Sequence, residues 1–315
     1  MNNKSYYTAE CGSSAGDRRQ MVESAAQAVF TVCAFCSIAV VAMITLYMAA
    51  NGLPALFRLG IREILFRTEW KPTADTPSFG ILYVVLTSVV GTAAAVVASV
   101  PIAVLTAVFL AEIAPERPAQ IVRAAVELLA GIPSVIYGLL GLMILNPLMY
   151  RVEQRIFQGS ERHQFTGGAN LLTAVLVLAV MILPTVIHIS ETAIRSVPVQ
   201  LKASSLALGA SRIQTIFRVV LPAARPGIVT AVVLGVGRAL GEAMAVGLVS
   251  GGRVNVTLPF SSVRFLTTAI VSEMGYAGGL HRQVLFTVGL ILFGFIMAVN
   301  AVINGVFAQN DRQEE

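Results

Sequence analysis

Apolar side chains along this chain gather into six long runs, which shorter polar segments separate. A helix needs roughly 20 apolar residues to cross about 30 Å of hydrocarbon, and every run reaches that length. The pattern therefore predicts six membrane-spanning helices. Their approximate limits are 25–49, 79–111, 121–147, 170–194, 226–250 and 283–306.

The composition favours the same fold class. Of the 315 residues, 56% are hydrophobic and 12% are charged, whereas about a quarter of the residues in a soluble domain are charged. So much apolar surface cannot be hidden in a water-soluble fold of this size. We therefore expect an all-α membrane protein. Its predicted parts are a tail at 1–24, a first helix and loop at 25–78, the main transmembrane domain at 79–306 and a tail at 307–315.

The charges of the loops do not fix an orientation. If both termini lie inside, the inner segments hold eleven Lys and Arg residues and the outer segments ten, so the positive-inside rule barely discriminates. The outer loops hold six acidic residues, which leaves that face net positive. Such a face attracts an anion or an acidic partner, although scattered, solvated arginines explain it equally well.

The chain offers no residue pattern of an enzyme. A P-loop requires Gly-Lys-Ser/Thr, and none of Lys4, Lys71 and Lys202 follows a glycine. The three histidines are scattered, and Cys33 and Cys36 lie inside an apolar run, where they are expected to be small helix residues. We therefore expect no ATPase site, no metal and no bound cofactor in this chain.

Residues 196–225 form an unusually long connection between the fourth and fifth runs. The spacing predicts a short helix over 201–208, which Gly209 ends. Ser211 is a suitable N-cap for a second short helix, and Leu-Pro at 221–222 is expected to end it. Two short amphipathic helices form either a knob that a soluble protein can bind or a pair that rests on lipid headgroups.

This segment resembles the cytoplasmic coupling loop of ABC importer permeases, whose pattern contains Glu-Ala-Ala, Gly and Leu-Pro at fixed intervals. Gly209 and the Leu-Pro pair stand at the right interval, while Ala203 replaces the glutamate. The resemblance implies that the loop binds ATPase subunits and that it faces the cytoplasm, as do both termini. The residues that it assigns to ATPase coupling are Ala203, Ser204, Ser205, Leu208, Gly209, Ala210, Leu221 and Pro222.

The stretch LGVGRALGEAMAVG places Arg238 and Glu242 four residues apart inside the fifth apolar run. On one helix the two side chains share a face and lie about 6 Å apart along the axis. A charge that faces lipid is strongly disfavoured, so both should face the protein interior, with Arg238 near the centre of the bilayer. Either they neutralise each other or a neighbouring helix, or they line a translocation pathway. We favour the pathway, because a guanidinium suits phosphate-like oxyanions.

GRALGEAMAV also resembles the fifth-span signature of the permeases of phosphate-specific ABC importers. Three further stretches favour the PstC type: TEWKP at 68–72, VELLAGIPSVIYGLLGL at 126–142 and FLTTAIVSEMGYAG at 265–278. The similarity runs over about 69–303. In this alignment, the arginine and the glutamate that matter in the family fall on Arg238 and Glu242.

The third run supplies two secondary candidates. The hydroxyls of Ser134 and Tyr137 stand in GIPSVIYG, where they line the pathway or, more simply, pack between helices. Two acidic residues near span ends are expected to pair with arginines at i,i+4 spacing. These pairs are Glu127 with Arg123 and Glu191 with Arg195.

The resemblance implies a six-helix permease subunit of a type I ABC importer, forming half of the pathway for inorganic phosphate in a bacterial cytoplasmic (inner) membrane. It implies a PstA-like second permease, two PstB-like ATPase subunits that hold ATP-Mg, a PstS-like binding protein, and no nucleic acid. A permease for sulfate or molybdate is the near alternative. A passive anion channel would leave the 196–225 loop unexplained, and an enzyme of lipid phosphates would need a His, Asp or Ser cluster that the sequence lacks.

Overall fold

The computed structural model describes residues 13–160 and 163–311. The chain divides into two compact units, one up to Ala50 and one from Asn51 onward. The described residues form six helices long and apolar enough to cross a membrane, so the expected fold class and number of spans are confirmed. These helices cover Val22–Leu59, Leu82–Ile113, Ser134–Ile156, Leu171–Arg195, Arg212–Gly241 and Gly279–Val302.

The first span belongs to α1 (Ser13–Leu59), which is longer than the predicted 25–49. In the first unit, the apolar side chains of this helix are exposed on all sides, as Phe30 and Phe35 illustrate. A helix that is apolar all round is suited to lipid rather than to water.

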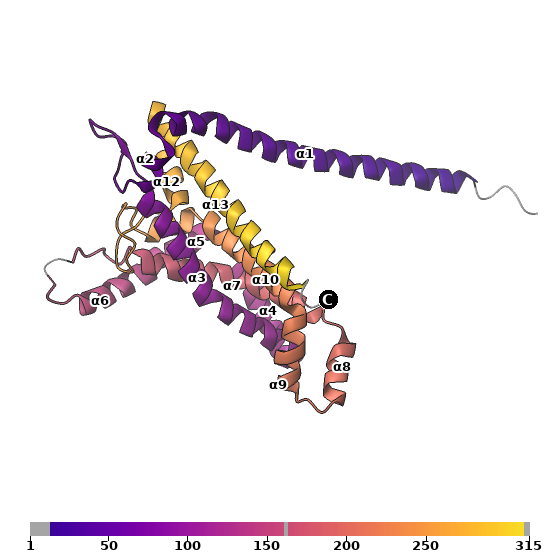
Figure 1. The fold of residues 1–315 in the computed structure, drawn as a ribbon. Coiled ribbons are helices and arrows are strands. Elements are labelled where there is room, and N and C mark those ends of the chain that lie inside the picture. The colour runs from indigo at the N-terminus through magenta and orange to yellow at the C-terminus, as the bar shows by residue number, and fades with distance from the viewer. Residues whose placement is uncertain (1–12, 161–162, 312–315) are drawn as a thin grey trace, which may run out of the picture. The chain divides into compact units, whose positions relative to one another are not determined.

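Three helices form the centre of the second unit. α3 (Leu82–Val108), α7 (Leu171–Arg195) and α10 (Leu221–Gly241) pack against one another (Figure 1). Alanines such as Ala95 and Ala174 are fully buried in this core, and small residues let membrane helices approach closely. α7 is the most enclosed of the six candidate spans.

The third span does not have the predicted limits of 121–147. Residues Glu116–Gly131 form a separate helix, α4, and the span itself consists of α5 (Ser134–Leu140), the π turn η2 (Gly141–Leu145) and α6 (Asn146–Ile156). The prediction is wrong because Pro133 forces the preceding residue, Ile132, into an extended conformation (φ −72°, ψ 126°).

The 196–225 loop contains the two expected short helices. α8 covers Val199–Ala207, and Gly209 follows it with φ +85°, a left-handed conformation that glycine adopts without strain. The second helix, α9, covers Arg212–Thr215, and Ser211 caps it together with Gln214. Both predictions are confirmed.

The expectation that Leu221-Pro222 ends the second helix is wrong. A π turn, η3 (Ile216–Val220), joins α9 to α10 without a break. In this turn the Leu221 N–H bonds to the Ile216 carbonyl. Pro222 follows in the first turn of α10, where the missing N–H and the fixed φ are tolerated.

The two ends of the α3, α7 and α10 layer differ. α8 and α9 lie at one end, whereas α2 (Ile61–Phe66) and α12 (Leu266–Glu273) lie near the other (Figure 1). This second end also carries a short antiparallel pair, β1 (Trp70–Lys71) with β2 (Ser78–Phe79), in which Trp70 faces Phe79. The remaining helices are α11 (Met244–Val249) and α13 (Gly279–Asp311).

Candidate functional site

The fifth span does not have the predicted limits of 226–250, because the helix ends at Gly241, within the charged stretch. α10 ends at Gly241, Glu242 is extended (φ −74°, ψ 122°), and α11 begins at Met244. The Glu242 carboxylate accepts a hydrogen bond of 2.9 Å from the Ala245 N–H, and the Glu242 carbonyl accepts one of 2.7 Å from the Thr267 hydroxyl. The break is thus held by its own side chain and by α12.

Arg238 and Glu242 therefore do not share one continuous helix, and the two side chains form no ion pair. The prediction of one helical face fails because the Glu242 side chain binds the Ala245 N–H at the start of α11. This N–H has no carbonyl partner within its own helix. A carboxylate is also favoured at a helix N-terminus by the helix dipole. The two charges are separated by a change in backbone direction.

Arg238 is held by α7. Its Nη1 donates to the Thr185 hydroxyl over 3.0 Å, and Thr185 stands fourteen residues after Leu171 and ten before Arg195. Arg238 is therefore level with the middle of α7. No carboxylate of the described residues forms an ion pair with it, so its positive charge is not neutralised by a direct partner.

Open space adjoins the half-buried Arg238. A Cβ atom built on Gly237 or on Gly241 would meet no atom within 4 Å other than those of its chain neighbours and of its own helix backbone. Leu234 and Met244, on the same stretch, are exposed. The charged break is thus bordered by surface that the described residues do not cover.

The secondary candidates are placed differently. Tyr137 is buried, and its hydroxyl donates over 2.6 Å to the Leu129 carbonyl near the end of α4, a bond that ties α5 to α4. Ser134, in the first turn of α5, is half-buried, and its hydroxyl has no hydrogen-bond partner among the described residues. A pathway role for either residue stays a prediction.

The stretches that carry the family resemblance meet in space. Gly138 of the third run packs against α11 so closely that a Cβ atom there would lie 2.7 Å from the Ala245 Cα. At the end opposite the 196–225 loop, Trp70 of TEWKP donates its indole N–H to both carboxylate oxygens of Glu273, over 3.0 and 3.1 Å. The four stretches therefore pack in pairs: the third run with the start of α11, and TEWKP with the segment that contains Glu273.

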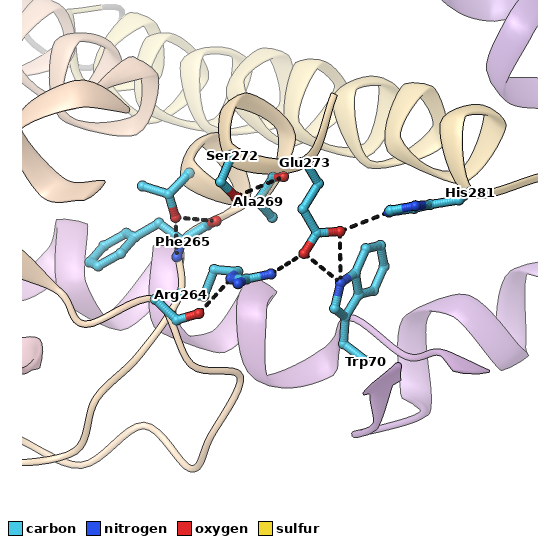
Figure 2. Close-up of polar contacts among 9 residues, drawn as sticks. Trp70, Arg264, Phe265, Ala269, Ser272, Glu273 and His281 are labelled. Carbon is cyan, nitrogen blue, oxygen red and sulfur yellow. Dashed lines mark hydrogen bonds and ion pairs between the residues drawn. The ribbon is translucent and has the colours of Figure 1, made fainter. Parts of the chain in front are cut away.

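Glu273 is the centre of a cluster that the sequence did not predict (Figure 2). Besides Trp70, the carboxylate binds His281 Nε2 over 2.8 Å and forms an ion pair with Arg264 Nη1. Its side chain is 5% exposed. We call Trp70, Arg264, Glu273 and His281 the Glu273 cluster; it joins β1, α12 and α13. The one signal in the sequence was a glutamate inside an otherwise apolar stretch.

The acidic pairs near the 196–225 loop are only partly as expected. Arg195 Nε binds Glu191 over 2.9 Å, as the i,i+4 spacing predicts. Arg123 does not pair with Glu127, however, and binds Glu191 over 2.7 Å instead. The prediction fails because α4 is a separate helix that packs on α7, which brings Arg123 to the α7 carboxylate.

The 196–225 loop presents apolar side chains to its surroundings. Leu208 is 90% exposed, and Val199, Ile213 and Phe217 are more than half exposed. Ala203, Ser204 and Gly209 are exposed as well, whereas the Ser205 hydroxyl bonds to Thr215 over 3.0 Å. Exposed apolar side chains gathered on a loop with defined helices are typical of a protein contact site.

Among the described residues, no group of three His, Cys, Asp or Glu side chains is arranged to hold a metal ion. Cys33 and Cys36 are free and exposed on α1.

Comparisons with known proteins agree on a family. The sequence profile of the family "Binding-protein-dependent transport system inner membrane component" matches residues 99–313. The "Probable ABC transporter permease protein YqgH" of Bacillus subtilis (strain 168) is 38% identical, over 91% of this chain and 92% of its own. Two proteins named "Phosphate transport system permease protein PstC" are each 35% identical. That of Mesorhizobium japonicum covers 82% of both chains, and that of Pasteurella multocida covers 73% of this chain and 75% of its own.

Solved structures show the same fold. A bacterial ABC transporter involved in the import of the acidic polysaccharide alginate superposes with a TM-score of 0.63, over 93% of this chain and 98% of its own. At 18% sequence identity, this similarity concerns the fold alone.

Proposed function

Because this chain belongs to the binding-protein-dependent inner membrane transport components, and among them to the PstC-type permeases, we propose that it forms half of the translocation pathway of an ATP-driven importer of inorganic phosphate. The observation that carries this proposal is the state of Arg238. A permanent positive charge lies level with the middle of a buried span, without a carboxylate partner among the described residues and beside open space.

The chemistry of Arg238 suits a tetrahedral oxyanion. A guanidinium has five N–H donors in a planar fork that matches phosphate, and a single one of them bonds to Thr185. The others remain for an anion. A charge inside a membrane protein is costly and is a sign of function unless another charge pairs with it. An anion that arrives at Arg238 supplies the missing partner.

Glu242 is the second charged residue of the site, and its carboxylate bears on anion release and selectivity. Its carboxylate lies at the break of the fifth span, bound to the N–H of Ala245. A carboxylate accepts the proton of a protonated oxyanion, and a fully deprotonated oxyanion has no such proton to donate. We propose that Glu242 lowers the affinity for the anion enough for release and favours hydrogen phosphate over sulfate.

The rest of the transporter follows from the family. In this proposal the exposed apolar side chains of the 196–225 loop bind PstB-like ATPase subunits, which hold ATP-Mg, in the cytoplasm, where both termini also lie. A PstA-like permease completes the pathway, and a PstS-like binding protein delivers phosphate to the end that carries the Glu273 cluster. Closure of the ATPases on ATP moves the loop and switches the spans between two states of access.

The test is phosphate uptake by the assembled complex in proteoliposomes, with ATP inside and loaded binding protein outside. Arg238→Gln should lower uptake by about a hundredfold or more, the scale of losing one electrostatic contact at a reacting centre, while the subunits still co-purify. The matched control is Arg117→Gln, since Arg117 on α4 is exposed, lies outside the 196–225 loop and the Glu273 cluster, and has no ion pair among the described residues. Uptake at the normal rate, or loss of assembly instead of uptake, would contradict the role given to Arg238.

The same vesicles separate the alternatives. An importer of phosphate should be inhibited by excess unlabelled phosphate bound to its binding protein and not by sulfate or molybdate. A permease for another oxyanion would give the opposite order. A passive anion channel would conduct without ATP.

A further inference from the structure

The 196–225 loop is attached to the spans in two different ways. Its second half is anchored by apolar contacts, in which Ile216 and Val220 pack with Val108 of α3 and Ile194 of α7. Its first half, α8, buries no residue. Among the described residues, one side-chain hydrogen bond or ion pair ties α8 to a helix outside the loop, namely that of Lys202 with Glu112. The two side chains are 22% and 14% exposed, so water screens the pair only in part.

Glu112 lies on an irregular piece of helix, the π turn η1 (Phe109–Ile113) at the end of α3. The Ala114 N–H bonds to the Phe109 carbonyl over 2.7 Å, which leaves the Leu110 carbonyl without that donor. The next residue, Pro115, has no N–H to give. The sequence of the turn therefore creates a carbonyl that backbone donors do not satisfy.

Two arginines bind this carbonyl. Arg123 Nη2 of α4 donates to the Leu110 oxygen over 3.2 Å, and Arg195 Nη2 of α7 donates to it over 3.0 Å. The Nε atoms of both arginines bind one oxygen of Glu191, over 2.7 and 2.9 Å. The π turn is thus tied to α4 and to α7 at a single point.

Polar side-chain contacts, together with the backbone of α7, therefore join α8 to the centre of the second unit. The connection runs from Lys202 to Glu112, through the π turn to Arg195, and along α7 to Thr185, the residue that binds Arg238. Single π turns inside helices are rare and are frequent at functional sites. Displacement of α8 is expected to act on this turn first.

We propose that Lys202 and Glu112 are positioning residues for transport: their ion pair transmits the movement of α8, through the π turn of α3, to α4 and α7. This inference rests on the proposed function, in which partner ATPases move the loop.

The experiment measures phosphate uptake and ATP hydrolysis in the same proteoliposomes. Lys202→Gln and Glu112→Gln should each raise the ATP consumed per phosphate imported by about tenfold, the usual scale of a coupling between sites, while the ATPases still bind. The exchange variant, Lys202→Glu with Glu112→Lys, should return the ratio to within about threefold of normal. The control is Glu63→Gln, which breaks an exposed ion pair with Arg67 on α2 and should leave the ratio unchanged.

The ratio of ATP consumed to phosphate imported tests the role of the Lys202–Glu112 pair. A normal ratio in both glutamine variants, or a ratio in the exchange variant as high as in the glutamine variants, would overturn the proposal. If a glutamine variant does not assemble, Lys202→Arg keeps the charge and must import phosphate at a near-normal ratio; a tenfold rise there would overturn the proposal too. Failure of the unaltered complex to import phosphate would refute the proposed function itself, a result distinct from any change in the ratio.

Discussion

Two charged side chains of this protein, the buried Glu273 and the half-buried Arg238, have opposite surroundings. The Glu273 carboxylate forms an ion pair with Arg264 and hydrogen bonds with the Trp70 indole N–H and the His281 ring, so both of its oxygens have partners (Figure 2). Arg238 receives a single threonine hydroxyl. Both side chains are costly to remove from water. In the Glu273 cluster, hydrogen bonds and an ion pair from other side chains offset the loss of hydration. At Arg238, no carboxylate of the described residues pairs with the charge.

In the proposed function, Glu273 stabilises the fold, whereas Arg238 binds the transported anion. The Glu273 cluster connects the segment around Trp70 to α12 and α13, which lie about 200 residues further along the chain. Arg238 connects α10 to α7 through one bond and keeps its other donors. We therefore expect substitutions in the cluster to reduce stability more than transport, and substitutions at Arg238 to do the reverse.

The largest effect on stability is expected for Glu273→Ala. It leaves Arg264 without its carboxylate, and breaking a buried ion pair from one side costs about 3–5 kcal/mol. Denaturant titration of the purified protein in detergent measures the loss. Glu69→Ala, which removes an exposed partner of Lys71, is the control and should change stability by less than about 0.5 kcal/mol. A Glu273 variant as stable as this control would contradict the structural role of the cluster.

A smaller effect is expected at the break of the fifth span. Glu242→Ala removes the acceptor for the Ala245 N–H at the start of α11, a change that costs about 1 kcal/mol. Glu242→Gln keeps an oxygen there and should be nearly as stable as the parent. Because neither variant has the carboxylate, both should show a smaller preference for phosphate over sulfate in uptake assays. Preserved selectivity in Glu242→Gln would limit the role of Glu242 to capping.

The length of the apolar runs gave the number of spans correctly, because spanning a bilayer is a property of a single segment. The third span shows that an apolar run need not be a single helix. Its apolar run continues across 132–133, yet Pro133 divides it into α4 and α5, and only the second is part of the span. Local signals such as Gly209 and Ser211 were sufficient for the short helices of the 196–225 loop.

The geometry of the candidate site could not be predicted from local sequence signals. The break at Glu242 contains no proline, and it is stabilised by Thr267, which lies 25 residues further along the chain. The Glu273 cluster depends on Trp70, 203 residues away in the sequence. The identity of the charged residues can be read from the chain, whereas their partners depend on tertiary contacts.

The central claim is that the positive charge at position 238 faces the path of the anion. It is tested most directly by replacing that charge chemically, with Arg238→Cys in a chain whose three cysteines are changed to alanine. Uptake should be lost, and a thiol reagent that adds an ammonium group should restore a clear part of it, whereas a neutral reagent of similar size should not. Restoration by both reagents, or by neither when both have reacted, would contradict the claim.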